Sequence, residues 1–296
     1  MKRTLLLDIP DDFSFRATVY SHGWSQLAPF SLDAQTWRLK YVFQEGQKAV
    51  PAVLYEEERK VRIDLDGDAI ASEKVIADAR HVLRLDDDLS GFYAGLEGDA
   101  RLGWVSGKRA GRLIRSPTVW EDLVKTMCTT NCSWDLTKIM VTNLVEKLGT
   151  GNKAKAFPSA KAMAAMDEDF FRTEIRAGYR SPYFVELAGR VASGELDPQS
   201  WLTSELPTPE LKKEMKKVKG VGDYAADNLL KLVGRYDGLA LDSFLRSQFY
   251  KTHNKAKPCP DKKIEKHYRK YGEWSGLAIW CDMTESWAME HDEEKP

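Results

Sequence analysis

The sequence contains only four cysteines in 296 residues. Cys128, Cys132, Cys259 and Cys281 are irregularly spaced, which excludes the regular cysteine pattern of a small disulfide-stabilised secreted protein. Cys128 and Cys132 lie four residues apart, but no further zinc ligands follow nearby. We therefore expect free thiols in a reducing compartment and assign no metal to them.

Long apolar runs are also absent. No segment approaches the roughly 20 apolar residues that cross a bilayer, so no transmembrane helix is expected. The start, "MKRTLLLDIPDDF", has a short hydrophobic stretch and then turns acidic, unlike a signal peptide. The sequence predicts a soluble, intracellular protein with no membrane partner.

The chain as a whole lacks excess charge, because its net charge is −1. This argues against nucleic-acid binding over the whole surface, although an average can hide a local patch. Residues 207–272 contain sixteen Lys and Arg against eight Asp and Glu, an excess of +8 that leaves about −9 for the rest. This excess predicts a basic patch; the alternative is a solvated helix face rich in lysine.

Segments rich in β-branched and aromatic residues fill positions 13–65 and are separated by Gly, Asp or charged turns. These predicted antiparallel strands are "FSFRATVY", "TWRLKYVFQ", "AVPAVLYEE" and "KVRIDLDG". After Gly67 the apolar spacing becomes three and four, which is typical of helices. We expect helices within 71–85 and 87–96, then at about 117–128, 134–148, 159–176, 182–193, 208–217, 222–234, 242–250, 261–271 and 275–290.

This pattern predicts an α+β fold in which an N-terminal antiparallel sheet precedes a mostly helical body. We place the sheet domain with its flanking helices at residues 1–105 and the helical body at 106–296. Within the body, sub-domains are expected at about 106–200 and 201–290.

One stretch, "KGVGDYAADNLLKLVGRYDGLALDSFLR" at 219–246, carries the clearest functional signal. Its two glycines permit positive φ and leave backbone N–H groups uncovered at the start of a predicted helix, which favours anion binding. Lysines just upstream make a nucleic-acid phosphate the expected anion. The alternative is an ordinary tight turn between helices. The expected phosphate-binding residues are Lys217, Lys219, Gly220, Val221 and Gly222.

The stretch resembles the helix-hairpin-helix superfamily of DNA glycosylases, in which a Gly-rich hairpin precedes an aspartate. Four segments before this stretch also match, in the order seen in the branch containing 8-oxoguanine and 3-methyladenine II DNA glycosylases. They are "RLDDDLSGFY", "SPTVWEDLVKTMCTTN", "AFPSAKAMAAM" and "RAGYRSPY". The resemblance covers roughly residues 13–290. It implies a TBP-like sheet domain, a helix-hairpin-helix motif, and a monomer acting on double-stranded DNA with a damaged base, in the cytoplasm, nucleoid or nucleus.

Asp242 takes the position of the superfamily's catalytic aspartate, which implies that it stabilises the positive charge on the sugar and orients or deprotonates water. The alternative, compatible role is that of a helix N-cap. Tyr224 stands where lyase-competent relatives carry a lysine, and a phenol cannot form a Schiff base. The resemblance therefore implies a monofunctional glycosylase, with Tyr224 packing in the site wall.

Three residues match positions that fill the gap left by an extruded base: Asn131, Tyr179 and Arg180. The hairpins of such enzymes also hold a monovalent cation, Na⁺ or K⁺, through main-chain carbonyls when DNA is bound. Here these carbonyls would belong to Lys216, Val218 and Val221. No other cofactor is expected, and an iron–sulfur cluster is excluded because that branch needs four closely grouped C-terminal cysteines.

A flipped base is held by aromatic faces, which also attract a cationic alkylated purine. The predicted pocket residues are Trp24, Gln26, Phe30, Trp134 and Trp280, and core packing is the alternative for each tryptophan. Ile279 falls in the register where the oxidised-guanine branch carries a glutamine, so an alkylated purine is the expected substrate. An oxidised or deaminated purine, such as 8-oxoguanine or hypoxanthine, and a non-catalytic helix-hairpin-helix protein remain alternatives.

Overall fold

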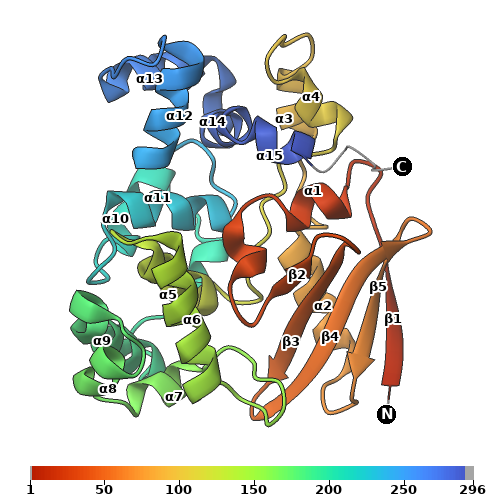
Figure 1. The fold of residues 1–296 in the computed structure, drawn as a ribbon, viewed down its shortest axis with the longest axis vertical. Coiled ribbons are helices and arrows are strands. Elements are labelled where there is room, and N and C mark those ends of the chain that lie inside the picture. Colours follow the sequence, from red (N-terminus) through yellow and green to blue (C-terminus); the bar gives the residue numbers. More distant parts are fainter. Residues whose placement is uncertain (1, 291–296) are drawn as a thin grey trace.

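The computed structural model describes residues 2–290, and its N-terminal part forms one five-stranded antiparallel sheet of order β1-β5-β4-β3-β2 (Figure 1). A helical body follows, so the predicted fold class is confirmed. The strands are β1 (Lys2–Asp8), β2 (Ser31–Asp33), β3 (Arg38–Glu45), β4 (Lys48–Glu57) and β5 (Lys60–Asp66).

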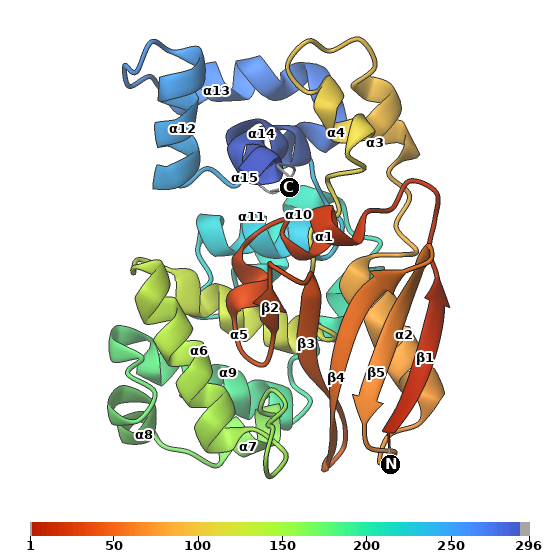
Figure 2. The same ribbon diagram turned by 45° about the vertical axis from the view of Figure 1, so that its right-hand side comes forward.

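The sheet buries one face, as its alternating sequence requires. In β4, Val50, Ala52 and Leu54 are buried while the residues between them are more exposed, and Leu54 pairs with buried Ile63 of β5. Helix α2 (Ser72–Leu83) contacts β1 and β3 and lies against the sheet in Figure 2. The buried stripe of β4 therefore belongs to the core of the molecule.

One N-terminal prediction was wrong, and two strands were missed. Residues 13–20 form no strand, because Ser14 caps the short helix α1 (Phe15–Val19) by accepting from the Ala17 amide at 3.2 Å. The alternation in this segment was real but too short to separate a strand from a helix turn. Strands β1 and β2 were not predicted, since β1 is a largely exposed edge strand and β2 has only three residues.

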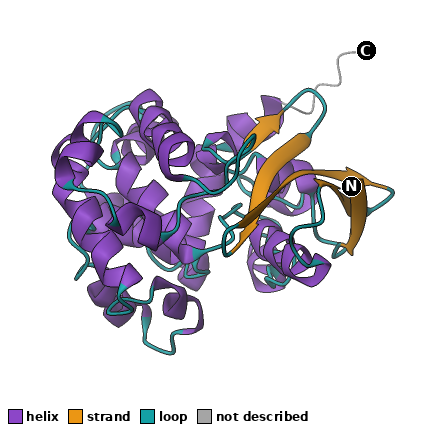
Figure 3. Cartoon of the chain, turned by 90° about the horizontal axis from the view of Figure 1, so that it is seen from below, coloured by secondary structure: helices purple, strands orange, loops and turns teal. Residues whose placement is uncertain are grey.

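The predicted helices are present, several with shifted bounds and two of them divided. Figure 3 shows the strands gathered at one side of a mostly helical molecule. The segment 159–176 contains two helices separated by Asp167, which caps the second, and 275–290 is divided near Thr284. The helices after α2 are α3 (Ser90–Gly95), α4 (Gly103–Gly107), α5 (Val119–Thr129), α6 (Trp134–Leu148), α7 (Ala160–Ala164), α8 (Glu168–Thr173), α9 (Ser181–Ala192), α10 (Thr208–Met215), α11 (Asp223–Leu232), α12 (Ser243–His253), α13 (Asp261–Tyr268), α14 (Ser275–Met283) and α15 (Glu285–Glu290).

Buried apolar side chains form two clusters. The larger cluster joins the sheet and α2 to α5, α6, α9 and α11. The smaller cluster joins α3 and α4 to α12, α13 and α14, which gather at one end of the molecule in Figures 1 and 2. The domain division at residue 105 stays a prediction.

A buried arginine connects α2 to the end of α11. Arg84, which has no exposed side-chain surface, donates through Nη2 to the carbonyls of Lys231 (2.7 Å) and Leu232 (2.6 Å). It also donates through Nε to Leu113 O and pairs with Asp87 at 2.6 Å. The same carbonyls also accept from the Gly234 amide and from Arg115 Nη1, so Arg84 is part of a set of donors that fixes the C-terminus of α11.

Among the helices of residues 2–290, none combines the length and the apolar character that a membrane crossing requires.

Candidate active site

The hairpin between α10 and α11 has the predicted glycine turn. Gly220 has φ +88°, a conformation that favours glycine, whereas Gly222 has φ −88° and is the N-cap of α11. Only the first glycine therefore needs the left-handed region. The Val221 amide donates to Val218 O at 3.0 Å, and both valine side chains are buried, which anchors the turn to the core.

The turn presents free backbone donors. Among the described residues, none accepts a hydrogen bond from the backbone amides of Lys219, Gly220 or Gly222. The lysine side chains around them are paired: Lys216 with Asp223 at 2.9 Å, Lys217 with Glu214 at 2.7 Å. These ion pairs are exposed and therefore weak, so a phosphate can compete for the lysines.

Asp242 is the N-cap of α12, as its alternative role required. Its Oδ1 accepts from the Leu245 amide at 2.7 Å. Within the described chain, Oδ2 receives no hydrogen bond, and Asp242 lines the same cleft as the hairpin. The cap holds the carboxylate in one orientation and leaves its second oxygen for a ligand.

Tyr224 lies in the first turn of α11, near both Thr129 and Asp242. Burial, followed by the negative charge of Asp242, raises the pKa of its phenol, although a hydrogen bond with Thr129 opposes the shift. The phenol therefore stays neutral. Asn228 lies one turn further along the same helix face, where its Nδ2 donates to Tyr224 O at 2.8 Å, and it also lines the cleft.

Lys231 lies three residues after Asn228 on the same face of α11, but it does not line the cleft. Its side chain is 3 % exposed, its Nζ donates to Leu239 O at 3.3 Å, and it lies 5.6 Å from the centre of the Trp280 ring. Burial lowers the pKa of Lys231 to about 8, against the opposing effect of Asp227 and Asp242. A titratable positive charge is thus present behind the Trp280 ring.

Segments far apart in the sequence enclose a single cleft of about 1360 Å³. This exceeds the roughly 300–1,000 Å³ of small-molecule pockets. The structure brings to it most of the predicted site residues, namely Trp24, Gln26, Asn131, Trp134, Tyr179, Lys216, Val218, Lys219, Gly220, Val221, Gly222, Tyr224, Asp242 and Trp280. Lys217 does not line it.

Asn131 and Tyr179 meet at the cleft edge. Asn131 has φ +46°, and its Nδ2 lies 3.5 Å from the Tyr179 hydroxyl, which also lies 3.2 Å from Thr130 Oγ1. The Tyr179 side chain is 47 % exposed. A large ring and an amide therefore project together toward solvent at the edge of the cleft.

Arg180 does not join them there, contrary to the prediction. It is 4 % exposed and donates through Nε to Met127 O (3.1 Å) and Thr130 Oγ1 (3.2 Å), with its guanidinium over the Tyr179 ring. Arg180 therefore supports the loop that carries Asn131.

Aromatic rings form the wall facing α14. His22 stacks on Trp24 with ring centres 4.9 Å apart, and Trp24 donates through Nε1 to Asp122 at 2.7 Å. Burial, with nearby positive charges, lowers the pKa of His22 to about 3, so the imidazole is neutral. Its Nε2 has no partner among the described residues although it is buried. Trp280 meets His22 edge-on and donates to Ser21 O.

Trp134 also lines the cleft and packs beside this segment, where its Nε1 donates to Gln26 Oε1 at 3.0 Å. Gly23 leaves space for this indole, because a Cβ there would lie 2.3 Å from Trp134 Cζ2. Phe30 was wrongly placed in the pocket: it is 3 % exposed and packs against Tyr41 and Lys125 in the core. Its position next to Pro29 in an aromatic segment gave no sign of which way the ring would turn.

Sequence reasoning missed several cleft residues. Phe244 follows Asp242 on α12 and stacks on Trp287 of α15, with ring centres 5.5 Å apart. Trp287 in turn packs edge-on against Trp280. The spacing of seven between Trp280 and Trp287 was the available signal, since it places both rings on one helical face.

No protein-family model matches the sequence, and no curated protein matches it. Solved structures nevertheless match over nearly the whole chain. MBOgg1, solved in complex with a low affinity DNA ligand, is 20 % identical and has a TM-score of 0.77, covering 97 % of this chain and 96 % of that chain. The 8-oxoguanine glycosylase/lyase of Clostridium acetobutylicum, in complex with double-stranded DNA, is 20 % identical with a TM-score of 0.75 and covers 98 % of each chain.

The 3-methyladenine DNA glycosylase of Archaeoglobus fulgidus has a TM-score of 0.75 at 17 % identity, covering 94 % of this chain and 97 % of that chain. The chain therefore shares the fold of these solved DNA glycosylases, and the predicted resemblance is confirmed at the level of the fold. Structures named for two different lesions match equally well, so fold similarity alone does not select a substrate.

Proposed function

We propose that this protein is a DNA glycosylase that extrudes a damaged purine from duplex DNA and hydrolyses its N-glycosidic bond. One observation carries the proposal: the Asp242 carboxylate and the free amides of the hairpin open onto the same cleft. A phosphate held by the hairpin amides and the N-terminus of α11 would place the neighbouring sugar beside Asp242. The similar folds solved with DNA support this arrangement.

In the proposed reaction the C1′–N bond breaks and its electron pair leaves with the base. Asp242 stabilises the positive charge that develops on the sugar. Water then attacks C1′, and the carboxylate accepts its proton. The Leu245 amide keeps Oδ1 fixed during these steps, which leaves Oδ2 to face the sugar.

We further propose that the enzyme is monofunctional. Tyr224 lies four residues after Gly220, where an amine would be needed for a Schiff base, and its neutral phenol cannot supply one. Lys231 is on the same helix but is buried behind the cleft wall, and Lys219 pairs with Glu186. The product is therefore an intact abasic site.

An alkylated purine fits the aromatic walls. His22, Trp24, Trp280 and Trp287 offer ring faces and edges, and a cationic base is attracted to such faces. The unpartnered His22 Nε2 offers one hydrogen bond to a base edge. We assign Asn131 and Tyr179 to the space left in the duplex, and the carbonyls of Lys216, Val218 and Val221 to a monovalent cation with DNA bound.

One observation favours a second candidate substrate. Protonated Lys231 lies behind the Trp280 ring and opposes a cationic base, so it favours a neutral lesion such as an oxidised or deaminated purine. Release assays on duplexes containing methylated, oxidised or deaminated bases distinguish the two candidates directly.

The test of the activity is Asp242→Asn. Asparagine keeps the N-cap, so folding and DNA binding stay near wild type, whereas base release falls by about 10³-fold or more because the charge is lost. Strand breaks in the wild-type product appear only after hot alkali. Asp167→Asn is the matched control, since Asp167 caps α8 in the same way outside the cleft.

Unchanged release by Asp242→Asn removes this carboxylate from the mechanism. If the wild-type protein binds duplex DNA but releases no base from the panel, the protein is a non-catalytic DNA-binding module. Breaks without alkali contradict the monofunctional assignment.

A further inference from the structure

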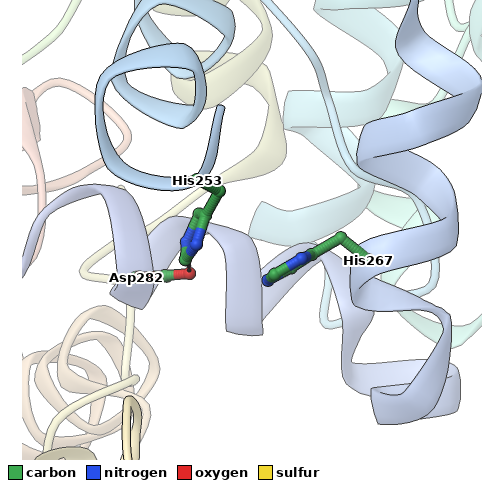
Figure 4. Close-up of side chains that lie close together, drawn as sticks. All are labelled: His253, His267 and Asp282. Carbon is green, nitrogen blue, oxygen red and sulfur yellow. Dashed lines mark hydrogen bonds and ion pairs between the residues drawn. The ribbon is translucent and has the colours of Figure 1, made fainter. Parts of the chain in front are cut away.

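A second cluster of chemically active side chains lies outside the cleft, where α12, α13 and α14 meet. It consists of His253, His267 and Asp282, one from each helix (Figure 4). One ligand atom from each residue lies within 4.8 Å of the others. Figure 4 shows both imidazoles directed toward the carboxylate from two different sides.

We propose that these three residues bind a divalent transition-metal ion, with Zn²⁺ the best fit. Two imidazoles and one carboxylate form a donor set that suits zinc, and three protein ligands leave one position for water. Ligand atoms in a tetrahedral site lie about 3.4 Å apart when metal–ligand distances are about 2.1 Å. The cluster therefore needs adjustments on the order of 1 Å, which side-chain rotation provides at exposed His267.

The carboxylate is already oriented by a surrounding shell. Asp282 is 3 % exposed; its Oδ2 accepts from the Tyr268 hydroxyl at 2.7 Å and its Oδ1 from Arg101 Nε at 2.6 Å. Arg101 also pairs with Glu285 at 2.6 Å, so its charge is shared between two carboxylates. Such partners fix the geometry of metal ligands. Oδ2, which Tyr268 holds in place, is also the oxygen that lies nearest His253.

The imidazoles are available as ligands. His253 Nε2 lies 2.7 Å from Asp282 Oδ2, and the two histidine rings are 4.4 Å apart. In the metal-free protein Nε2 carries the ring hydrogen and donates it to Asp282 Oδ2. Metal binding would replace this hydrogen bond, because a shift of the hydrogen to Nδ1 frees the Nε2 lone pair without releasing a proton. Lys270, which opposes a cation, is itself held by Asp99.

A bound ion would add a link between three helices that already meet through apolar packing, through hydrogen bonds to Asp282 and through the Arg246–Asp261 ion pair. His253 ends α12, and Asp242 caps the start of the same helix, so the ion would hold the end of α12 that is remote from the cleft. The role we assign to it is structural. The proposal does not depend on glycosylase activity.

The test uses the full chain after treatment with a chelator. Titration with ZnCl₂ in a calorimeter should show one site per chain, and Co²⁺ should give a tetrahedral visible spectrum without thiolate charge-transfer bands. His267→Asn and His253→Asn should each weaken Zn²⁺ binding at least tenfold. Lys266→Asn, an exposed change beside His267 on α13, should bind like wild type. One equivalent of Zn²⁺ should raise the melting temperature of wild type and Lys266→Asn only.

Circular dichroism establishes that each variant is folded. Of the two histidine substitutions, His267→Asn should disturb the fold less, because His267 is exposed. Absence of saturable 1:1 binding by wild type, thiolate bands in the Co²⁺ spectrum, or undiminished binding by both histidine variants overturns the proposal. The cluster is then only a His–Asp hydrogen bond. The readout of this test is metal binding. Failure of the metal-site proposal therefore leaves the proposed glycosylase activity unaffected, and failure of the proposed activity leaves the metal site unaffected.

Discussion

Lys231 is the residue whose charge has the clearest consequence for substrate choice. Its ammonium lies behind Trp280, and burial lowers its pKa to about 8. The charge is therefore present below pH 8 and is lost as the pH rises through 8. Under the proposed function, a cationic damaged base would be repelled only while Lys231 is protonated.

We expect the ratio of release of a cationic alkylated purine to release of a neutral oxidised purine to rise several-fold between pH 7 and pH 9. Lys231→Met keeps the packing of the aliphatic stem and should make this ratio high and independent of pH. Single-turnover release from two matched duplexes measures it. Exposed Lys219→Met is the control and should retain the pH dependence; equal pH profiles for wild type and Lys231→Met would contradict the assignment.

At the scale of single residues, the sequence indicated which residues belong near the cleft better than it indicated which way their side chains point. Asp242 and Tyr224 could be found because their spacing from the hairpin glycines is set along one continuous backbone. Phe30 and Arg180 were misplaced because burial depends on elements that are distant in sequence. Lys125 of α5 packs on the Phe30 ring, and Met127 O of the same helix accepts from Arg180 Nε. The contact between Lys231 and Trp280 could not be predicted for the same reason, since the two residues are remote in sequence.

Among the elements, the hairpin is held by one glycine. A Cβ at Gly220 would lie 2.8 Å from Tyr183 Cδ2 and 3.0 Å from Met127 Cε, and φ is +88°. Gly222 has open space and negative φ, so it forms a matched control two residues away.

Gly220→Ala should lower the free energy of unfolding by about 1–2 kcal/mol and weaken binding to any duplex about tenfold, because the turn must shift. Gly222→Ala should change stability by less than about 0.5 kcal/mol. Urea unfolding and fluorescence anisotropy with undamaged DNA measure the two effects. Equal stability of both variants would show that the turn tolerates a side chain at either position.

Long periodic elements were predictable, and short ones were not. The prediction 134–148 coincides with α6, where Ser133 supplies the cap by accepting from the Leu136 amide. In contrast, 13–20 has five helical residues whose conformation is decided by the Ser14 cap, and β2 exists because it pairs with β3. Periodicity carries little information over such lengths.

At the scale of the whole molecule, Arg84 connects the two core clusters around the end of α11. Arg84→Met would leave carbonyls of Lys231 and Leu232 and the Asp87 carboxylate without this donor. We expect a loss of about 3–5 kcal/mol in the free energy of unfolding. Arg80→Met on the same helix removes an exposed pair with Asp86 and should cost less than about 1 kcal/mol. Chemical denaturation followed by tryptophan fluorescence measures both, and similar losses would contradict a special role for Arg84.

The fold class followed from the change of apolar period after Gly67, but the grouping of helices did not. Helices α3 and α4 precede residue 110 and yet pack with α12, α13 and α14. Such pairing depends on shape complementarity between distant segments, which a single sequence does not display. The predicted boundary at residue 105 rested on composition alone.

The buried Arg84 bonds also have a consequence for the proposed complex with DNA. Arg84 holds the end of α11, and the first turn of α11 lines the cleft, so we expect this wall to move little when a duplex binds. Under the proposed function, most of the bending and unstacking would then come from the DNA. Base pairs that are already weakened would therefore be extruded most readily, whatever the chemistry of the damaged base.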